Sequence, residues 1–278
     1  MRRLIIWASI VMAASLILAV TIAGCGSGQG AGSTTISAGA TGGVLTIAQA
    51  LLAERGSTIS VRGLLLAPSG GDVSQMVLSS ALLESYPPQA GGATIGLKGL
   101  DLEDLVGLSS TSDRPDLAQA TWSDYSMVLG GVIKDGALEV QTIPRVVEGT
   151  AVGAAIRFSP ASEPMASGDT VWWAFDVKNP GSTPLQLKFA SGQHVEVVLA
   201  QGGVEKYRWS AGKAFTQAVE DVTIQPGKKW STAVNDTIAV PAGEYDLTAT
   251  VTADVAGTGT GNSPGNALPQ LTTTIRVN

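Results

Sequence analysis

The chain has 278 residues, of which 44% are hydrophobic and only 14% charged, and its formal net charge is −6 at pH 7. An acidic chain is a poor partner for nucleic acid or anionic lipid, because both attract positive charge. One cysteine and one histidine are present, so an intrachain disulfide is excluded and a zinc site lacks its usual donors. We expect a protein without cofactors that folds by packing alone.

The N-terminal segment has the features of an export signal. Arg2 and Arg3 precede an uncharged, mostly apolar run, Leu4–Ile22, that ends close to Gly24-Cys25. A small residue directly before a lone cysteine resembles the bacterial lipobox. That resemblance implies cleavage after Gly24, acylation of the Cys25 thiol, palmitate included, and an extracytoplasmic protein anchored to the membrane by its lipid. The alternative is an uncleaved anchor, since the run approaches the ~20 residues that span a bilayer.

Composition divides the remainder of the chain. Residues 1–24 are the predicted signal peptide, and residues 25–43 form a Gly/Ser/Thr/Ala tract without charge that we interpret as a flexible spacer. Ordered structure is predicted in two domains, at residues 44–143 and 150–278, where apolar residues recur at regular spacing.

The first domain has the pattern of a small barrel. A capping box at its start predicts a short helix over Thr46–Gly56, followed by strands at Thr58–Ala67 and Thr94–Leu100. Ser126–Ile143 holds two apolar runs around Asp135-Gly136, which is a strong hairpin signal. One helix and about five strands in roughly 100 residues resemble an OB-fold.

The second domain has the period of antiparallel strands. Alternating apolar residues mark Val171–Val177, Leu185–Phe189, Tyr245–Val251 and Leu271–Val277, and Asn179-Pro180-Gly181 is a turn. Short alternating strands at near-regular spacing predict an immunoglobulin-like antiparallel β-sandwich. The fold class is therefore all-β, with a small OB-like barrel followed by this sandwich.

Three short motifs follow one another within Phe175–Tyr245. They are Arg208-Trp209-Ser210, Phe215-Thr216-Gln217 and Pro241-Ala242-Gly243-Glu244-Tyr245. In this order they resemble the intracellular proteinase inhibitor (BsuPI) family. The resemblance implies a β-sandwich and the inhibition of a subtilisin-type serine protease. The founding activity of that family is cytosolic, whereas this chain carries an export signal.

A second resemblance covers the barrel. Glu84–Gln89, a glycine pair at Gly91-Gly92 and Trp122-Ser123-Asp124 are similar to small OB-like domains of bacterial lipoproteins. Those relatives carry a cysteine where this chain has Ala90, so a disulfide implied by the resemblance is missing here. Tyr86-Pro87-Pro88 is interpreted either as a rigid corner of the barrel or as a recognition surface.

Catalytic and metal-binding patterns are weak. His194 is the single histidine, and the sequence places no nucleophile or orienting acid beside it. Asp101, Glu103 and Asp104 lie close together but lack the Asp-x-Asp-x-Asp-Gly spacing of a calcium loop. We therefore expect neither an enzyme nor a metal site.

Exposed aromatic and arginine side chains are the candidates for partner contacts. Trp173 belongs to the inward-facing set, so Trp172 should point outward and either cover the other domain or contact a partner. Trp209 is either a core residue or an interface anchor. The candidate partner-binding residues are Trp172, Gln193, Arg208, Trp209, Phe215 and Gln217.

The sequence thus favours an exported, membrane-anchored lipoprotein that binds another protein and does no chemistry. In its sharpest form the hypothesis is an inhibitor of an extracytoplasmic serine protease. The alternative is a structural or assembly scaffold of the cell envelope without inhibitory activity.

Overall fold

The structure is a computed structural model that describes residues 43–68, 75–112, 114, 116–151, 153–256 and 266–278. These residues belong to one compact unit, Ser37–Asn278. The predicted signal peptide, Cys25 and all but the last residue of the predicted spacer lie outside the described residues. Among the described helices, none is long and apolar enough to cross a membrane.

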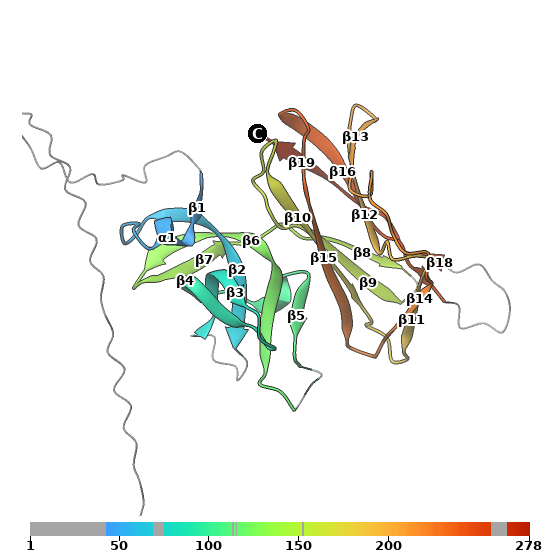
Figure 1. The fold of residues 1–278 in the computed structure, drawn as a ribbon, viewed down its shortest axis with the longest axis horizontal. Coiled ribbons are helices and arrows are strands. Elements are labelled where there is room, and N and C mark those ends of the chain that lie inside the picture. Colours follow the sequence, from blue (N-terminus) through green and yellow to red (C-terminus); the bar gives the residue numbers. More distant parts are fainter. Residues whose placement is uncertain (1–42, 69–74, 113, 115, 152, 257–265) are drawn as a thin grey trace, which may run out of the picture. The chain divides into compact units, whose positions relative to one another are not determined.

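The first half of the described chain forms a closed barrel (Figure 1). Its strands are β1 Val44–Thr46, β2 Thr58–Pro68, β3 Val77–Leu83, β4 Gln89–Lys98, β5 Leu108–Ser110, β6 Ala120–Lys134 and β7 Ala137–Thr142. The sheet runs β1-β2-β3-β4-β7-β6-β5, and β2 also pairs with β6, which closes the five central strands on themselves. The parallel pair β4–β7 breaks an otherwise antiparallel barrel, as in a five-stranded Greek-key barrel of the OB type.

Local sequence signals account for the barrel's turns. The Thr46 hydroxyl accepts from Gln49 N–H, so the predicted capping box is present, although helix α1 covers only Ile47–Ala50. Asp135 and Gly136 connect β6 to β7 with φ of 52° and 75°, the left-handed pair that a two-residue hairpin turn requires. A second short element, the 3₁₀ helix η2, spans Leu102–Asp104.

Gly63, in the middle of β2, lets α1 pack closely against the barrel. A Cβ on this residue would lie 2.8 Å from Ile47 Cδ1 and 3.1 Å from the Ser79 carbonyl oxygen. Ile47 is buried at this contact, so any larger residue at position 63 would displace the helix or the strand.

The second half of the described chain forms the antiparallel sandwich. Its strands are β8 Val147–Ala151, β9 Ala154–Pro160, β10 Thr170–Lys178, β11 Leu185–Phe189, β12 Val195–Gln201, β13 Val204–Arg208, β14 Glu220–Ile224, β15 Lys229–Thr237, β16 Gly243–Val251, β17 Asp254–Val255, β18 Asn266–Ala267 and β19 Leu271–Val277. They pair as β15-β10-β9-β8, β13-β12-β16-β19 and β14-β11-β17-β18. The predicted all-β class, a barrel followed by a sandwich, is confirmed.

The sandwich core follows the predicted alternation. Trp173 and Phe175 of β10 are buried, and Phe158 of β9 packs against both rings. Tyr245 is buried as well, and its hydroxyl donates 2.7 Å to the Pro241 carbonyl. This is the contact of a tyrosine corner, which gives the Pro-x-Gly-Glu-Tyr motif a structural role in closing the sandwich.

One apolar cluster contains residues of both the barrel and β10. Ala161 and Ala174 are buried in the barrel cluster, and Trp172 packs against it with its ring 6.2 Å from that of Tyr125. Trp172 therefore points out of the sandwich, as the alternation predicts, and covers the barrel.

Polar groups reinforce the same junction. The Arg157 guanidinium donates to the carbonyl oxygens of Glu103 (2.7 Å) and Asp104 (3.0 Å). Asp176, only 1% exposed, accepts from Gly107 N–H at 2.9 Å. Backbone groups of the barrel thus find charged partners on the sandwich strands, which ties the two parts together.

Candidate functional site

The connection between β13 and β14 has the features of a binding loop. We call Trp209–Val219 the anchored loop; its second part, Lys213–Val219, has no regular secondary structure. Every residue of Lys213–Val219 except Phe215 is exposed. A long exposed segment held by a rigid scaffold is where proteins commonly carry recognition residues.

Two aromatic side chains hold this loop to the sandwich. Trp209 is only 8% exposed and donates its indole N–H to the Asn235 carbonyl at 3.1 Å. The Phe215 ring packs on it with centroids 5.6 Å apart. The Lys213 ammonium lies 5.1 Å from the Trp209 ring centre and 2.8 Å from an oxygen of Asp236. The loop is therefore fixed at its start and at Phe215.

Glu196 of β12 joins the start of the loop to the neighbouring strand. Its carboxylate accepts from Gln193 Nε2 (3.1 Å), from an Arg208 guanidinium nitrogen (3.3 Å) and from the N–H and hydroxyl of Ser210. Sequence reasoning missed Glu196, because these partners meet only once β12 has paired with β13. An acidic residue on the strand next to an arginine-bearing strand is the weak signal that was available.

The backbone of the loop is held at one point and otherwise open. Gly192 N–H donates to the Thr216 carbonyl at 2.9 Å. A Cβ at Gly192 would lie 2.5 Å from the Thr216 hydroxyl, so a larger residue there would force the Thr216 side chain to move. Within the described residues, the N–H groups of Ala214–Ala218 donate to no other protein group. These donors are therefore available to a partner strand.

Burial near the loop also perturbs one phenol. The pKa of Tyr207 is raised well above its usual value, mainly by burial and also by the nearby Asp236 carboxylate, which its hydroxyl meets at 3.3 Å. Tyr207 therefore stays a neutral hydrogen-bond donor at physiological pH. Asp236 in this way joins the Tyr207 hydroxyl on β13 to the Lys213 ammonium of the anchored loop.

The predicted partner-binding residues separate into two places. Arg208 and Gln217 are exposed at the anchored loop, whereas Gln193 and Phe215 are half-buried beside it. Trp209 is a core residue of the sandwich, and Trp172 lies at the barrel junction. Their role in partner binding stays a prediction.

The other candidates have structural partners. His194 Nε2 lies 3.0 Å from a carboxylate oxygen of Glu220, and its ring packs on Phe189. Asp101 caps η2 by accepting from Glu103 N–H at 3.0 Å. In the part of the chain that the structure describes, no three His, Cys, Asp or Glu side chains gather to hold a metal ion.

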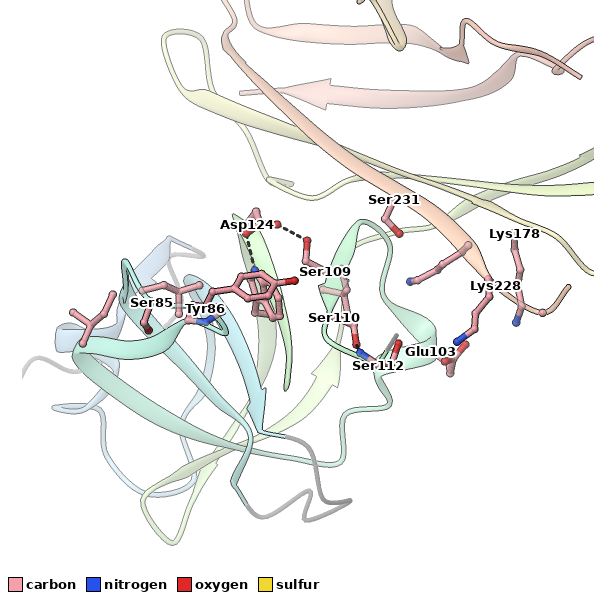
Figure 2. Close-up of a pocket in the computed structure, with 17 residues that line it drawn as sticks. Ser85, Tyr86, Glu103, Ser109, Ser110, Ser112, Asp124, Lys178, Lys228 and Ser231 are labelled. Carbon is pink, nitrogen blue, oxygen red and sulfur yellow. Dashed lines mark hydrogen bonds between the residues drawn. The ribbon is translucent and has the colours of Figure 1, made fainter. Parts of the chain in front are cut away.

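A second candidate site is a cleft of about 800 Å³ at the rim of the barrel (Figure 2). Figure 2 shows Ser85, Tyr86, Ser109 and Asp124 on one side and Ser231, Lys178 and Lys228 on the other. Its remaining lining residues are Leu82, Leu83, Pro88, Glu103, Leu108, Ser110, Ser112, Trp122, Gly227 and Lys229. The volume is in the range of small-ligand sites, about 300–1,000 Å³.

The geometry shows a β-sandwich that carries an exposed surface loop held by aromatic packing. The sequence model of the family "Intracellular proteinase inhibitor" (BsuPI) matches residues 158–255 of this chain. The match contains the whole anchored loop, and it confirms the resemblance drawn from the Arg-Trp-Ser, Phe-Thr-Gln and Pro-x-Gly-Glu-Tyr motifs.

The other comparisons do not identify a function for this chain. No curated protein matches the chain. Among solved structures, the CARDB domain of the PF1109 protein from Pyrococcus furiosus, in complex with di-metal ions, is 16% identical. The alignment covers 49% of this chain and 90% of that domain, with a TM-score of 0.25.

Proposed function

We propose that this chain is an exported, lipid-anchored protein that binds another protein through the anchored loop. In its specific form the proposal is inhibition of an extracytoplasmic serine protease. The observation that carries it is the exposed segment Lys213–Val219, fixed by Trp209 and Phe215 while the N–H groups of Ala214–Ala218 stay open. The match to the proteinase inhibitor family supports a protein as the partner.

The physical argument rests on preorganisation. A loop that enters a protease cleft must offer backbone donors to the enzyme and must lose little conformational entropy on binding. Here the Gly192–Thr216 hydrogen bond and the buried Trp209 ring restrict the loop before a partner arrives. The loop would therefore occupy a cleft by shape and hydrogen bonding, without chemistry of its own.

The proposed cellular location of the protein is based on the sequence alone. The Gly24-Cys25 lipobox and the preceding apolar run support lipid attachment and an extracytoplasmic location. An inhibitor tethered in this way would act on proteases at the outer surface of the cytoplasmic membrane.

A scaffold role in the envelope is the second candidate. The observation that favours it is the continuous packing between barrel and β10, through Ala161, Ala174 and Trp172. A protein whose two parts pack together can hold a partner on each part. It would not need the open donors of the anchored loop, which is why the inhibitor proposal comes first.

The test is titration of soluble protein, Gly26–Asn278 without lipid, against subtilisin-like and trypsin-like proteases. We expect stoichiometric inhibition of at least one protease, without cleavage of the protein. The paired change Gln217→Asp and Ala218→Asp, on the exposed part of the loop, should raise the inhibition constant by about tenfold or more, as changes at central interface positions do.

Thr272→Asp is the matched control, because Thr272 is exposed on β19 and lies outside the loop. Inhibition that persists in the loop variant would mean that the protease contacts another part of the protein. Absence of inhibition across the whole panel would leave the scaffold role as the better explanation.

A further inference from the structure

The cleft at the barrel rim contains an aromatic side chain that internal packing does not explain. Tyr86 is 61% exposed, whereas its neighbour Trp122 is 5% exposed. The two rings are 5.9 Å apart and nearly perpendicular, at 89°. An edge-to-face contact of this kind orients the Tyr86 ring and leaves much of it open to the cleft.

Polar contacts hold the Trp122 ring, against which Tyr86 packs. Trp122 donates its indole N–H to Asp124 at 2.7 Å, and the Ser109 hydroxyl donates to the other oxygen of the same carboxylate (Figure 2). Asp124 is exposed, so its remaining lone pairs can accept from a ligand. The barrel side of the cleft thus offers a fixed ring next to a fixed acceptor.

The opposite side of the cleft supplies donors. The Lys229 ammonium is engaged by the buried Asp176 at 3.1 Å. Lys178 is exposed and forms no ion pair with any described residue. Lys178 can therefore donate hydrogen bonds into the cleft. The Ser231 hydroxyl, which Figure 2 also places on this side, donates its proton to Asp176, so its oxygen can only accept from a ligand.

The lining excludes several ligand classes. Three lysines line the cleft beside two carboxylates, but Lys229 is already paired with Asp176. An extended polyanion would therefore meet the carboxylates of Glu103 and Asp124 with few free cations to offset them, on a chain of net charge −6. A purely apolar ligand would strip water from hydroxyl, carboxylate and ammonium groups without replacing their hydrogen bonds. What remains is a ligand with many hydroxyl groups and an apolar face that can stack on an aromatic ring.

We propose that this cleft binds a neutral oligosaccharide. One sugar ring stacks on Tyr86, and its hydroxyl groups exchange hydrogen bonds with Asp124 and Ser109. The chain of sugars extends toward Lys178, because the cleft is larger than one ring requires. This site is separate from the anchored loop and does not depend on the proposed inhibition of a protease.

The experiment titrates the soluble protein, Gly26–Asn278, with cellotetraose and with tetra-N-acetylchitotetraose by calorimetry. The indole N–H resonance of Trp122, assigned by its loss in Trp122→Phe, is followed in parallel by NMR. We expect saturable binding of at least one sugar and a shift of that resonance. Tyr86→Ala should weaken binding about three- to tenfold, the usual range for one aromatic contact.

Val204→Ala is the matched control, since Val204 is 57% exposed on β13 and lies outside the cleft. Far-ultraviolet circular dichroism checks that both variants are folded. Binding that is unchanged in Tyr86→Ala would overturn the location. No binding of either sugar at 10 mM, a concentration of the order expected to detect ligands of millimolar affinity, would overturn the ligand class. Binding of an uncharged, end-blocked tetra-alanine peptide in place of the sugars would overturn it as well.

Discussion

Removing the Asp176 carboxylate should destabilise the protein strongly, because three donors depend on it. The carboxylate accepts from Gly107 N–H (2.9 Å), the Ser231 hydroxyl (2.7 Å) and the Lys229 ammonium (3.1 Å). In Asp176→Ala, Lys229 and Ser231 can turn toward water, but Gly107 is buried on the barrel side. Its N–H would then lack an acceptor.

The magnitude follows from these contacts. Hydrogen bonds to a charged group contribute about 1.5–3 kcal/mol each, and breaking a buried charge pair costs about 3–5 kcal/mol. Because two of the three donors can be resolvated, we expect Asp176→Ala to lower the free energy of unfolding by about 3–4 kcal/mol. Asp176→Asn keeps one acceptor for Gly107 and should cost about half as much.

The assay is urea unfolding of the soluble protein followed by fluorescence. Asp254→Ala, at an exposed carboxylate of β17, is the control and should change stability by less than about 0.5 kcal/mol. A loss below about 1 kcal/mol in Asp176→Ala would refute the argument. It would mean that Gly107 finds another acceptor and that the junction does not depend on this carboxylate.

Three further predictions concern titration and lipid attachment. Burial raises the pKa of Glu163 despite the contact of its carboxylate with Arg145. The stability that Glu163 contributes is therefore present below its pKa in the unfolded chain and is lost as the pH rises through its pKa in the folded protein. Glu163→Gln should flatten this decline in the free energy of unfolding between pH 4 and 7. Arg208 lowers the pKa of Glu205, so the stability that Glu205 contributes is lost as the pH falls. Glu205→Gln should therefore change the pH dependence of the unfolding free energy in the opposite sense to Glu163→Gln. Equal slopes of unfolding free energy against pH in the two variants would contradict the assignment. Cys25→Ser is expected to abolish incorporation of labelled palmitate in bacterial cells, whereas persistent labelling would place the lipid on another residue.

Local patterns predicted the strands with clear alternation and several turns, because both depend on short-range chemistry. The alternation around Trp173 specified which face of β10 is buried, and the structure agrees. The Asp135-Gly136 turn and the Thr46 cap were also predictable, since each needs only neighbouring residues. Strands without a clear alternation of apolar residues were missed, among them β1, β3, β8 and β13 to β15.

The candidate site was predicted only in part. Motif resemblance pointed to Trp209, Phe215 and Gln217, which the fold does bring into one loop. It did not reveal Glu196, nor the role of Gly192 in holding the Thr216 carbonyl. Such contacts join residues on different strands, and their distances are set by strand pairing, not by spacing along the chain.

By itself, the sequence determined the all-β class, the order of barrel and sandwich, the hairpin at Asp135-Gly136 and the inward face of β10. Side-chain period and turn chemistry act over a few residues and can be read directly from the order of amino acids. Only the tertiary structure decided that Trp172 covers the barrel, that Asp176 holds Gly107, and that the rim of the barrel forms a cleft. These features depend on how separate sheets pack, and packing is a property of surfaces assembled from distant parts of the chain.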